Sequence, residues 1–274
     1  MSTDAKFVVP TLLTRATLWL LALGAGLPAL AAAQGFAAMV SPPRFELSGK
    51  PGETQRQVVE FMNADARPAT YRMRTSDWTL DSAGVVKLSD ELAPGSCRPW
   101  VAIERREITV AAGGRYRYRF EITPPAGASG ECRFALVLEG GGETVQAGQN
   151  VSIPVNGRIA VIVYVTLGDA APRLEVIRTA VAYREGRQVP LLYVLNSGTA
   201  HGRLEGFLEG TDASGHRVDF APAGLPILPG ETREIALNVA GDGKPQAAVD
   251  FPIAIRGALE WSGKSTPFEA RFAP

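Results

Sequence analysis

The pattern that most limits the fold of this chain is a strict alternation of polar and apolar residues in short runs. The clearest run, residues 115–123, reads Arg-Tyr-Arg-Tyr-Arg-Phe-Glu-Ile-Thr. It places Tyr116, Tyr118, Phe120 and Ile122 on one face of an extended strand. A helix would instead need apolar residues three or four positions apart. The pattern therefore predicts β-strands with one buried face and one solvated face.

Similar runs recur along the chain, separated by clusters of Gly, Pro, Asn and Asp. With 29 Gly and 20 Pro in 274 residues, the composition is typical of a protein with many turns. Short strands at this spacing predict an all-β fold of two immunoglobulin-like sandwiches. We expect strands at residues 44–48, 57–62, 70–75, 107–110, 115–123, 133–139, 151–166, 174–182, 189–195, 203–209, 217–220, 232–239, 251–261 and 267–272.

The predicted strands fall into two domains after an N-terminal segment of different character. The first domain is expected at residues 34–166, and its last strand, 151–165, is a long edge strand. A linker follows at 167–173, and the second domain covers 174–274. Between the strands, the glycine run 140–142 is expected to form a hairpin turn rather than a phosphate-binding loop, because no helix follows it.

The first 33 residues predict a cleavable signal peptide. Lys6 and Arg15 precede an apolar run, Pro28 ends it, and small residues follow at Ala29, Ala31 and Ala33. The alternative is a membrane anchor, because the run is nearly long enough to span a bilayer. No later segment is comparably apolar, so we expect no stable membrane insertion of the mature chain. The mature protein is expected outside the cytoplasm, in a periplasm.

Charge and residue counts exclude several classes of function. The chain has 28 basic and 28 acidic residues, so we expect no nucleic-acid partner. It has no GxxxxGK[ST] motif, so no nucleotide is expected. With two His and two Cys there is little material for a catalytic or metal site, and we expect a non-enzyme without cofactor or metal. His201 and His216 are expected to be surface residues of loops.

The two cysteines permit a single intramolecular bond. In an oxidising compartment we expect Cys97 and Cys132 to form this disulfide, and the alternative is two free or buried thiols.

The long strand at 151–165 carries an unusual combination of residues. Val151, Ile153 and Val155 recur at period two and share one face. Pro154 lies among them, and proline is confined to sheet edges or bulges because it cannot donate a ladder hydrogen bond. An apolar edge strand is normally an aggregation hazard, but a protein that pairs with another chain requires one. The alternative is an ordinary half-buried core strand.

Six segments of the first domain, taken in order, carry a resemblance to a known family. They are Val40-Ser-Pro-Pro-Arg44-Phe-Glu-Leu, Val59-Glu-Phe-Met-Asn63, Tyr71 to Trp78, Pro99-Trp100-Val, the alternating stretch 108–122 and the strand 151–165. In order and spacing this domain resembles the N-terminal domain of periplasmic pilus (fimbrial) assembly chaperones. The resemblance implies two immunoglobulin-like domains joined at an angle in an L shape.

The resemblance also implies a mechanism, called donor-strand complementation. Such a chaperone lends its long strand to a pilin-like subunit that lacks one strand of its own sandwich, without ATP. Val151, Ile153 and Val155 match the donor residues. The implied partners are secreted pilin-like subunits and an outer-membrane usher.

The family anchors the carboxylate of the subunit's C-terminus with an Arg on the first strand and a Lys on the long strand. Arg44 matches the Arg, but the Lys position falls on Ala160. Arg158, on the same strand face two residues earlier, is the candidate substitute. For both arginines the alternative is a solvated sheet face without a ligand. For the whole chain the alternative is a secreted structural or adhesion module that does not capture subunits, which Ala160 favours.

Overall fold

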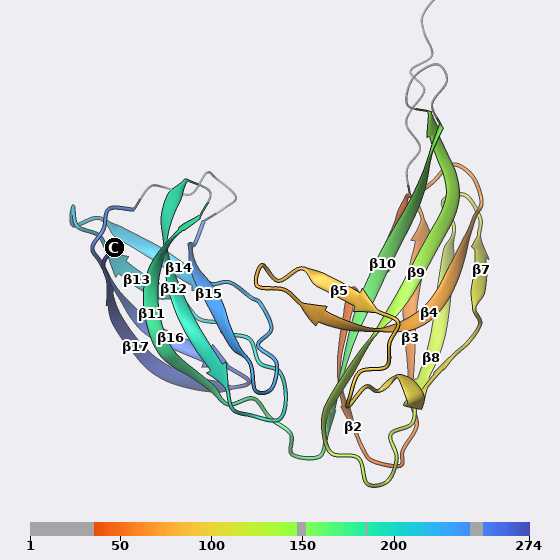
Figure 1. Ribbon diagram of the computed structural model, residues 1–274, viewed down its shortest axis with the longest axis horizontal. Coiled ribbons are helices and arrows are strands. Elements are labelled where there is room, and N and C mark those ends of the chain that lie inside the picture. The colour runs from red at the N-terminus through yellow and green to blue at the C-terminus, as the bar shows by residue number, and fades with distance from the viewer. Residues whose placement is uncertain (1–35, 147–151, 185, 242–248) are drawn as a thin grey trace, which may run out of the picture. The chain divides into compact units, whose positions relative to one another are not determined.

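The computed structural model, shown in Figure 1, describes residues 36–146, 152–184, 186–241 and 249–274. Every regular element in these ranges is a β-strand, except for one 3-10 turn, η1, at Arg98–Trp100. The predicted all-β fold is therefore confirmed. The predicted signal peptide lies outside the described residues. Within the described ranges, no helix is long and apolar enough to cross a membrane.

Two sheets form the first sandwich. One has the strand order β1-β3-β8-β6, and the other has the order β2-β10-β9-β4-β5, with β7 paired to β4. Within these sheets β2 and β10 pair in parallel, whereas the other pairs are antiparallel. The strands are β1 Ala38–Ser41, β2 Arg44–Gly49, β3 Gln55–Asn63, β4 Ala69–Leu80, β5 Val86–Ser89, β6 Val101–Ile103, β7 Glu107–Val110, β8 Arg115–Ile122, β9 Gly130–Gln146 and β10 Ser152–Leu167.

The core of this sandwich is built from the alternating residues that the sequence singled out. Tyr118, Phe120 and Ile122 of β8 are fully buried, and the arginines of the strand, Arg115, Arg117 and Arg119, are exposed. The ring of Phe120 packs edge-on against Phe45 of β2 and Phe134 of β9, with centroids 5.4 and 6.1 Å apart. These contacts join the two sheets, since Phe120 belongs to one and its partners belong to the other.

A disulfide bond links the segment before η1 to strand β9 within this core. Cys97, just before η1, is bonded to Cys132 of β9, and their Cα atoms lie 5.3 Å apart. Both residues are buried against the hydrophobic core. The predicted disulfide is therefore confirmed.

Seven strands form the second sandwich in the order β11-β12-β15-β14-β13-β16-β17. β15 pairs with β12 through residues 232–236 and with β14 through 237–239, so it links two groups of strands around one core. That core contains Leu192, Phe220 and Ile255. The strands are β11 Leu174–Arg184, β12 Arg187–Asn196, β13 Leu208–Thr211, β14 Arg217–Pro222, β15 Thr232–Val239, β16 Ile253–Trp261 and β17 Lys264–Phe272.

The prediction of a hairpin turn at residues 140–142 is wrong. β9 continues through these glycines to Gln146 and stays paired with β10, with a register shift between Val155 and Gly157. Gly140, together with Gly157 of β10, allows a close approach of another side chain. A Cβ atom on Gly140 or Gly157 would lie 2.6 or 1.7 Å from the side chain of Phe36, which packs over both positions.

The strand predicted at 203–209 is also largely wrong, because pairing begins only at Leu208. The preceding segment makes an isolated bridge from Glu205 to Glu260. It also passes through Gly206 at a φ of +118°, where a Cβ would lie 2.3 Å from the carbonyl oxygen of Ala258. This conformation favours glycine and interrupts the extended strand that the composition predicted.

Candidate functional site

The first feature of the site is an open sheet edge. β10 pairs with β9 along nearly its whole length, but it pairs with β2 only through residues 162–167. Across the described residues, no strand pairs with the other side of residues 152–161, which we call the free edge. The predicted edge strand is therefore an edge over its first part only, because β2 covers its last part. Unpaired backbone groups along such an edge can accept a strand from another chain.

The predicted donor residues lie at this edge as far as the structure describes them. Val151 lies outside the described residues. The backbone positions of Ile153 and Val155 are on the free edge, in register with Val145 and Glu143 of β9. Further along the strand, Val161 is buried in the core of the sandwich.

Arg44 lies where the free edge ends. It is the first residue of β2 and stands in register with Ile162, the residue that follows the free edge. A strand added beside the free edge would therefore run towards Arg44. Because β2 is parallel to β10, a strand that also ran parallel to β10 would bring its C-terminus to Arg44.

Arg158 does not lie beside Arg44. It shares a sheet face with Ala160 and Ile162, and four residues along a strand span roughly 13 Å. Its Nε is 3.0 Å from Oε1 of Glu139, the residue opposite it on β9. Arg74 of β4 donates to the same oxygen at 2.9 Å. The structure thus places Arg158 within an ion-pair network of the sheet, away from the first residue of β2.

The residue that the structure does bring towards Arg44 is Arg203, from the segment after β12. Both side chains approach Oε1 of Glu46: Nε of Arg44 is 2.8 Å away and Nε of Arg203 is 3.7 Å away. The Arg203 side chain is only 17% exposed, whereas those of Arg44 and Glu46 are half exposed. Sequence reasoning missed Arg203 because no local pattern links it to β2.

His201 lies in the same group, and the expectation that it is a surface residue is wrong. Its side chain is 9% exposed, and its ring stacks on Tyr164 of β10 with centroids 3.7 Å apart. Its Nδ1 lies 2.6 Å from Oε2 of the buried Glu131, and its Nε2 lies 3.6 Å from Oε1 of Glu46. His216, by contrast, is exposed as expected.

The pKa of Tyr164 depends on its burial and on the charged side chains around it. Burial raises the pKa of its hydroxyl to about 12, because the tyrosinate form would lose its hydration. Among the nearby charges Arg203 and Arg44 lower this pKa, whereas Glu131 and Glu46 raise it. Four charged groups of both signs therefore act on one buried hydroxyl.

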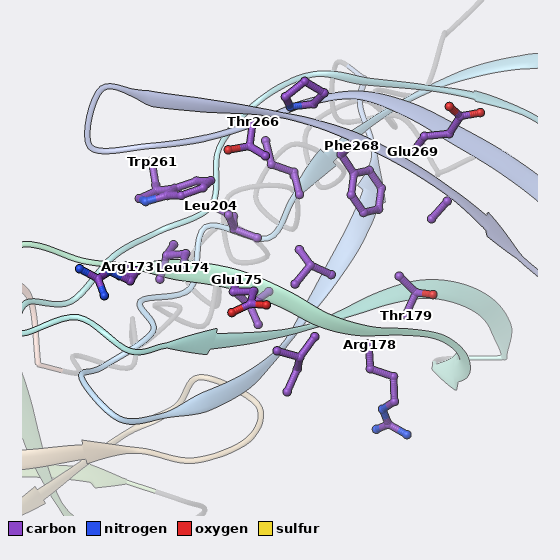
Figure 2. A pocket seen from close by; sticks show the side chains of 16 residues that line it. Arg173, Leu174, Glu175, Arg178, Thr179, Leu204, Trp261, Thr266, Phe268 and Glu269 are labelled. Carbon is purple, nitrogen blue, oxygen red and sulfur yellow. The ribbon is translucent and has the colours of Figure 1, made fainter.

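A separate cavity of about 810 Å³ lies in the second sandwich, between the two strands that end its sheet order, β11 and β17. Figure 2 shows Leu204, Trp261 and Phe268 among its lining side chains. The lining residues include no His, Cys or Ser. In the described part of the chain there is also no group of three or more potential metal-ligating residues.

Comparison with known proteins gives the following results. No protein-family model matches the sequence, and no curated protein matches it. Among solved structures, the YadV chaperone is similar, with a TM-score of 0.46 and 11% identity over 85% of this chain and 98% of that one. The E. coli chaperone DraB has a TM-score of 0.45 and 13% identity, over 88% and 98%. The Salmonella enterica complex of the SafA pilin with the SafB chaperone has a TM-score of 0.45 and 13% identity, over 88% of this chain and 98% of that one.

Proposed function

We propose that this chain is a periplasmic chaperone that binds secreted pilin-like subunits by strand addition along the free edge of β10. The observation that carries the proposal is the position of this edge: it is open through residues 152–161 and stops at Arg44. A subunit strand parallel to β10 would pair with the free edge and present its C-terminal carboxylate to the Arg44 guanidinium. An outer-membrane usher would receive the subunit.

The proposed activity is binding and requires no nucleotide or cofactor. In a strand, alternate residues direct their backbone groups to a given edge, so the free edge offers about five residues for pairing. Each backbone hydrogen bond contributes about 1 kcal/mol, and apolar side chains at Ile153 and Val155 would add contacts on one face. Such pairing would hold an incomplete subunit sandwich until its own assembly partner replaces the chaperone strand.

The test is subunit capture in the periplasm of the source bacterium. We expect Ile153→Arg to reduce co-purification of the subunit, because a charge in the donor row opposes burial of that row. Arg44→Ala is expected to reduce it by loss of the carboxylate contact. The matched control is Arg117→Ala, an exposed arginine of the other sheet. Partners would be identified by mass spectrometry. Unchanged subunit yield and complex formation in both variants would show the proposal to be wrong.

A second candidate function is a secreted structural or adhesion module that reuses the fold without subunit capture. The observation that favours it is Ala160, which supplies no cation beside Arg44, together with the engagement of Arg158 by Glu139. A module of this kind would remain in a surface fibre. Fractionation of the cell surface distinguishes the two, since a chaperone is released from the assembled structure.

A further inference from the structure

Arg44 and Arg203 approach a single carboxylate oxygen from different parts of the chain. Oε1 of Glu46 is within 4 Å of the Nε atoms of both guanidinium groups. A carboxylate between two arginines is the geometry expected of a carboxylate-binding site, because each guanidinium offers charge-assisted hydrogen bonds. In this structure the carboxylate belongs to the protein itself.

Arg203 is held in a way that suits a binding residue. Its Nη1 donates a hydrogen bond to the carbonyl oxygen of Gly224 at 2.7 Å, which restrains the side chain. Its Nε is buried and has no hydrogen-bond partner among the described residues. The distance of 3.7 Å between this Nε and Oε1 of Glu46 is short enough for an ion pair but too long for a hydrogen bond. A buried donor without an acceptor is costly, and a carboxylate that approached more closely would remove this cost.

Glu46 is the carboxylate in ion-pair contact with both arginines. The other nearby carboxylate, Glu131, accepts hydrogen bonds from both the backbone N–H and the ring Nδ1 of His201, at 3.1 and 2.6 Å. Glu46 is half exposed, and within the described ranges its side-chain ion pairs are all made by Oε1. It can therefore turn towards solvent at small cost when another carboxylate takes its place.

We propose that Arg44 and Arg203 form a two-arginine clamp for the C-terminal carboxylate of the bound subunit strand, and that Glu46 occupies this clamp until the strand arrives. The clamp supplies the second cation that is missing at Ala160, and it assigns this role to Arg203 in place of Arg158. The proposal rests on strand addition along β10, because the free edge is what directs a strand's C-terminus to Arg44.

The clamp can be tested without any subunit, by using acetate as the probe. Glu46→Ala removes the atoms of an acetate group and leaves the two arginines in place. In the full chain carrying this substitution, we expect the Nε–H resonances of Arg44 and Arg203 to shift together as acetate is added, with a single dissociation constant. Resonances are assigned with Arg44→Lys and Arg203→Lys. Acetamide, which has the same shape without the charge, is expected to shift neither.

Two double variants separate Arg203 from Arg158. Arg203→Gln in the Glu46→Ala background is expected to weaken acetate binding about tenfold, the loss of roughly one charge-assisted hydrogen bond. Arg158→Gln in that background should leave the affinity unchanged. Acetate shifts confined to Arg44, or equal effects of the two double variants, would overturn the clamp.

This outcome can be told apart from failure of the proposed function. Absence of the clamp in the acetate titration would leave strand addition standing, because residues 152–161 are not involved in acetate binding. Conversely, normal subunit capture by both Ile153→Arg and Arg44→Ala alongside a positive acetate titration would refute strand addition and leave the carboxylate site in place.

Discussion

Asn63 and Asn196 occupy corresponding positions in the two sandwiches, since each is the last residue of a strand and each is fully buried. The Nδ2 group of Asn63 donates to the carbonyl oxygens of Arg67 and Val110, at 2.7 and 3.2 Å. That of Asn196 donates to Ala200 and Ile227, both at 2.8 Å. In both cases one buried side chain satisfies a carbonyl of the turn that follows the strand and a carbonyl of a segment distant in the sequence.

Replacement of this side chain should be costly. We predict that Asn63→Ala lowers the free energy of unfolding by about 3 kcal/mol, because buried backbone carbonyls are left without donors. Urea denaturation measures the change. The control is Asn238→Ala, an exposed asparagine of β15, for which we expect a change within about 0.5 kcal/mol. Equal effects of the two substitutions would contradict this account of Asn63.

A second prediction concerns alkaline stability. The pKa of Tyr164 is raised to about 12 by burial, above about 10 in the unfolded chain. Below pH 10 the hydroxyl is neutral in both the folded and the unfolded state, so Tyr164 does not change the free energy of unfolding with pH. Between pH 10 and about 12 the unfolded state ionises first, so stability falls with rising pH. The free energy of unfolding is measured by urea denaturation at pH 8 and at pH 11.5. Between these two pH values, Tyr164→Phe should lose about 2 kcal/mol less of this free energy than the wild type. Parallel pH dependences of the wild type and the variant would disprove this origin.

At the scale of elements, the disulfide joins the loop that carries η1 to the long strand β9. Cys97 and Cys132 are 35 positions apart, and closing a loop of this length stabilises the folded state by roughly 3 to 4 kcal/mol in the chain-entropy model. We predict a loss of this size in Cys97→Ala/Cys132→Ala, measured by urea denaturation. Addition of a reductant should lower the stability of the wild type and leave the double variant unchanged.

The elements also show what could be predicted from the sequence. Strands such as 107–110 and 232–239 were predicted to the residue, because alternation is a local property of a half-buried strand. The glycines at 140–142 were misread because the close approach of Phe36 to Gly140 depends on a segment distant in the sequence. Arg44 was found only through the resemblance of its segment to a family.

The pairing of Arg203 with Glu46 had no signal at all in the sequence. It depends on the tertiary fold, which brings the segment after β12 to the first residues of β2. Arg158 was chosen instead because sequence spacing shows which residues share a strand face but not which strands lie beside it. The free edge was partly predictable, since Pro154 favours an edge, but its end at residue 161 follows from where β2 pairs.

At the scale of the whole molecule, the prediction concerns the segment before the first sandwich. We predict that the protein purified from the periplasm begins at Gln34, because the apolar run and the small residues that follow it form a signal-peptidase site. N-terminal sequencing and the intact mass measure this. Recovery of the chain in the membrane fraction with residues 1–33 still attached would support the anchor alternative.

The place where β2 begins has a further consequence for how partners would be selected. The free edge is bounded at one end, so a strand bound parallel to β10 can advance only until its terminus meets Arg44. Each side chain of that strand would then face a β10 residue determined by its distance from the C-terminus. The register of a bound strand would therefore be set by the distance of each residue from the C-terminus. Extension of a subunit by a single residue would move every apolar side chain of that strand to the opposite face.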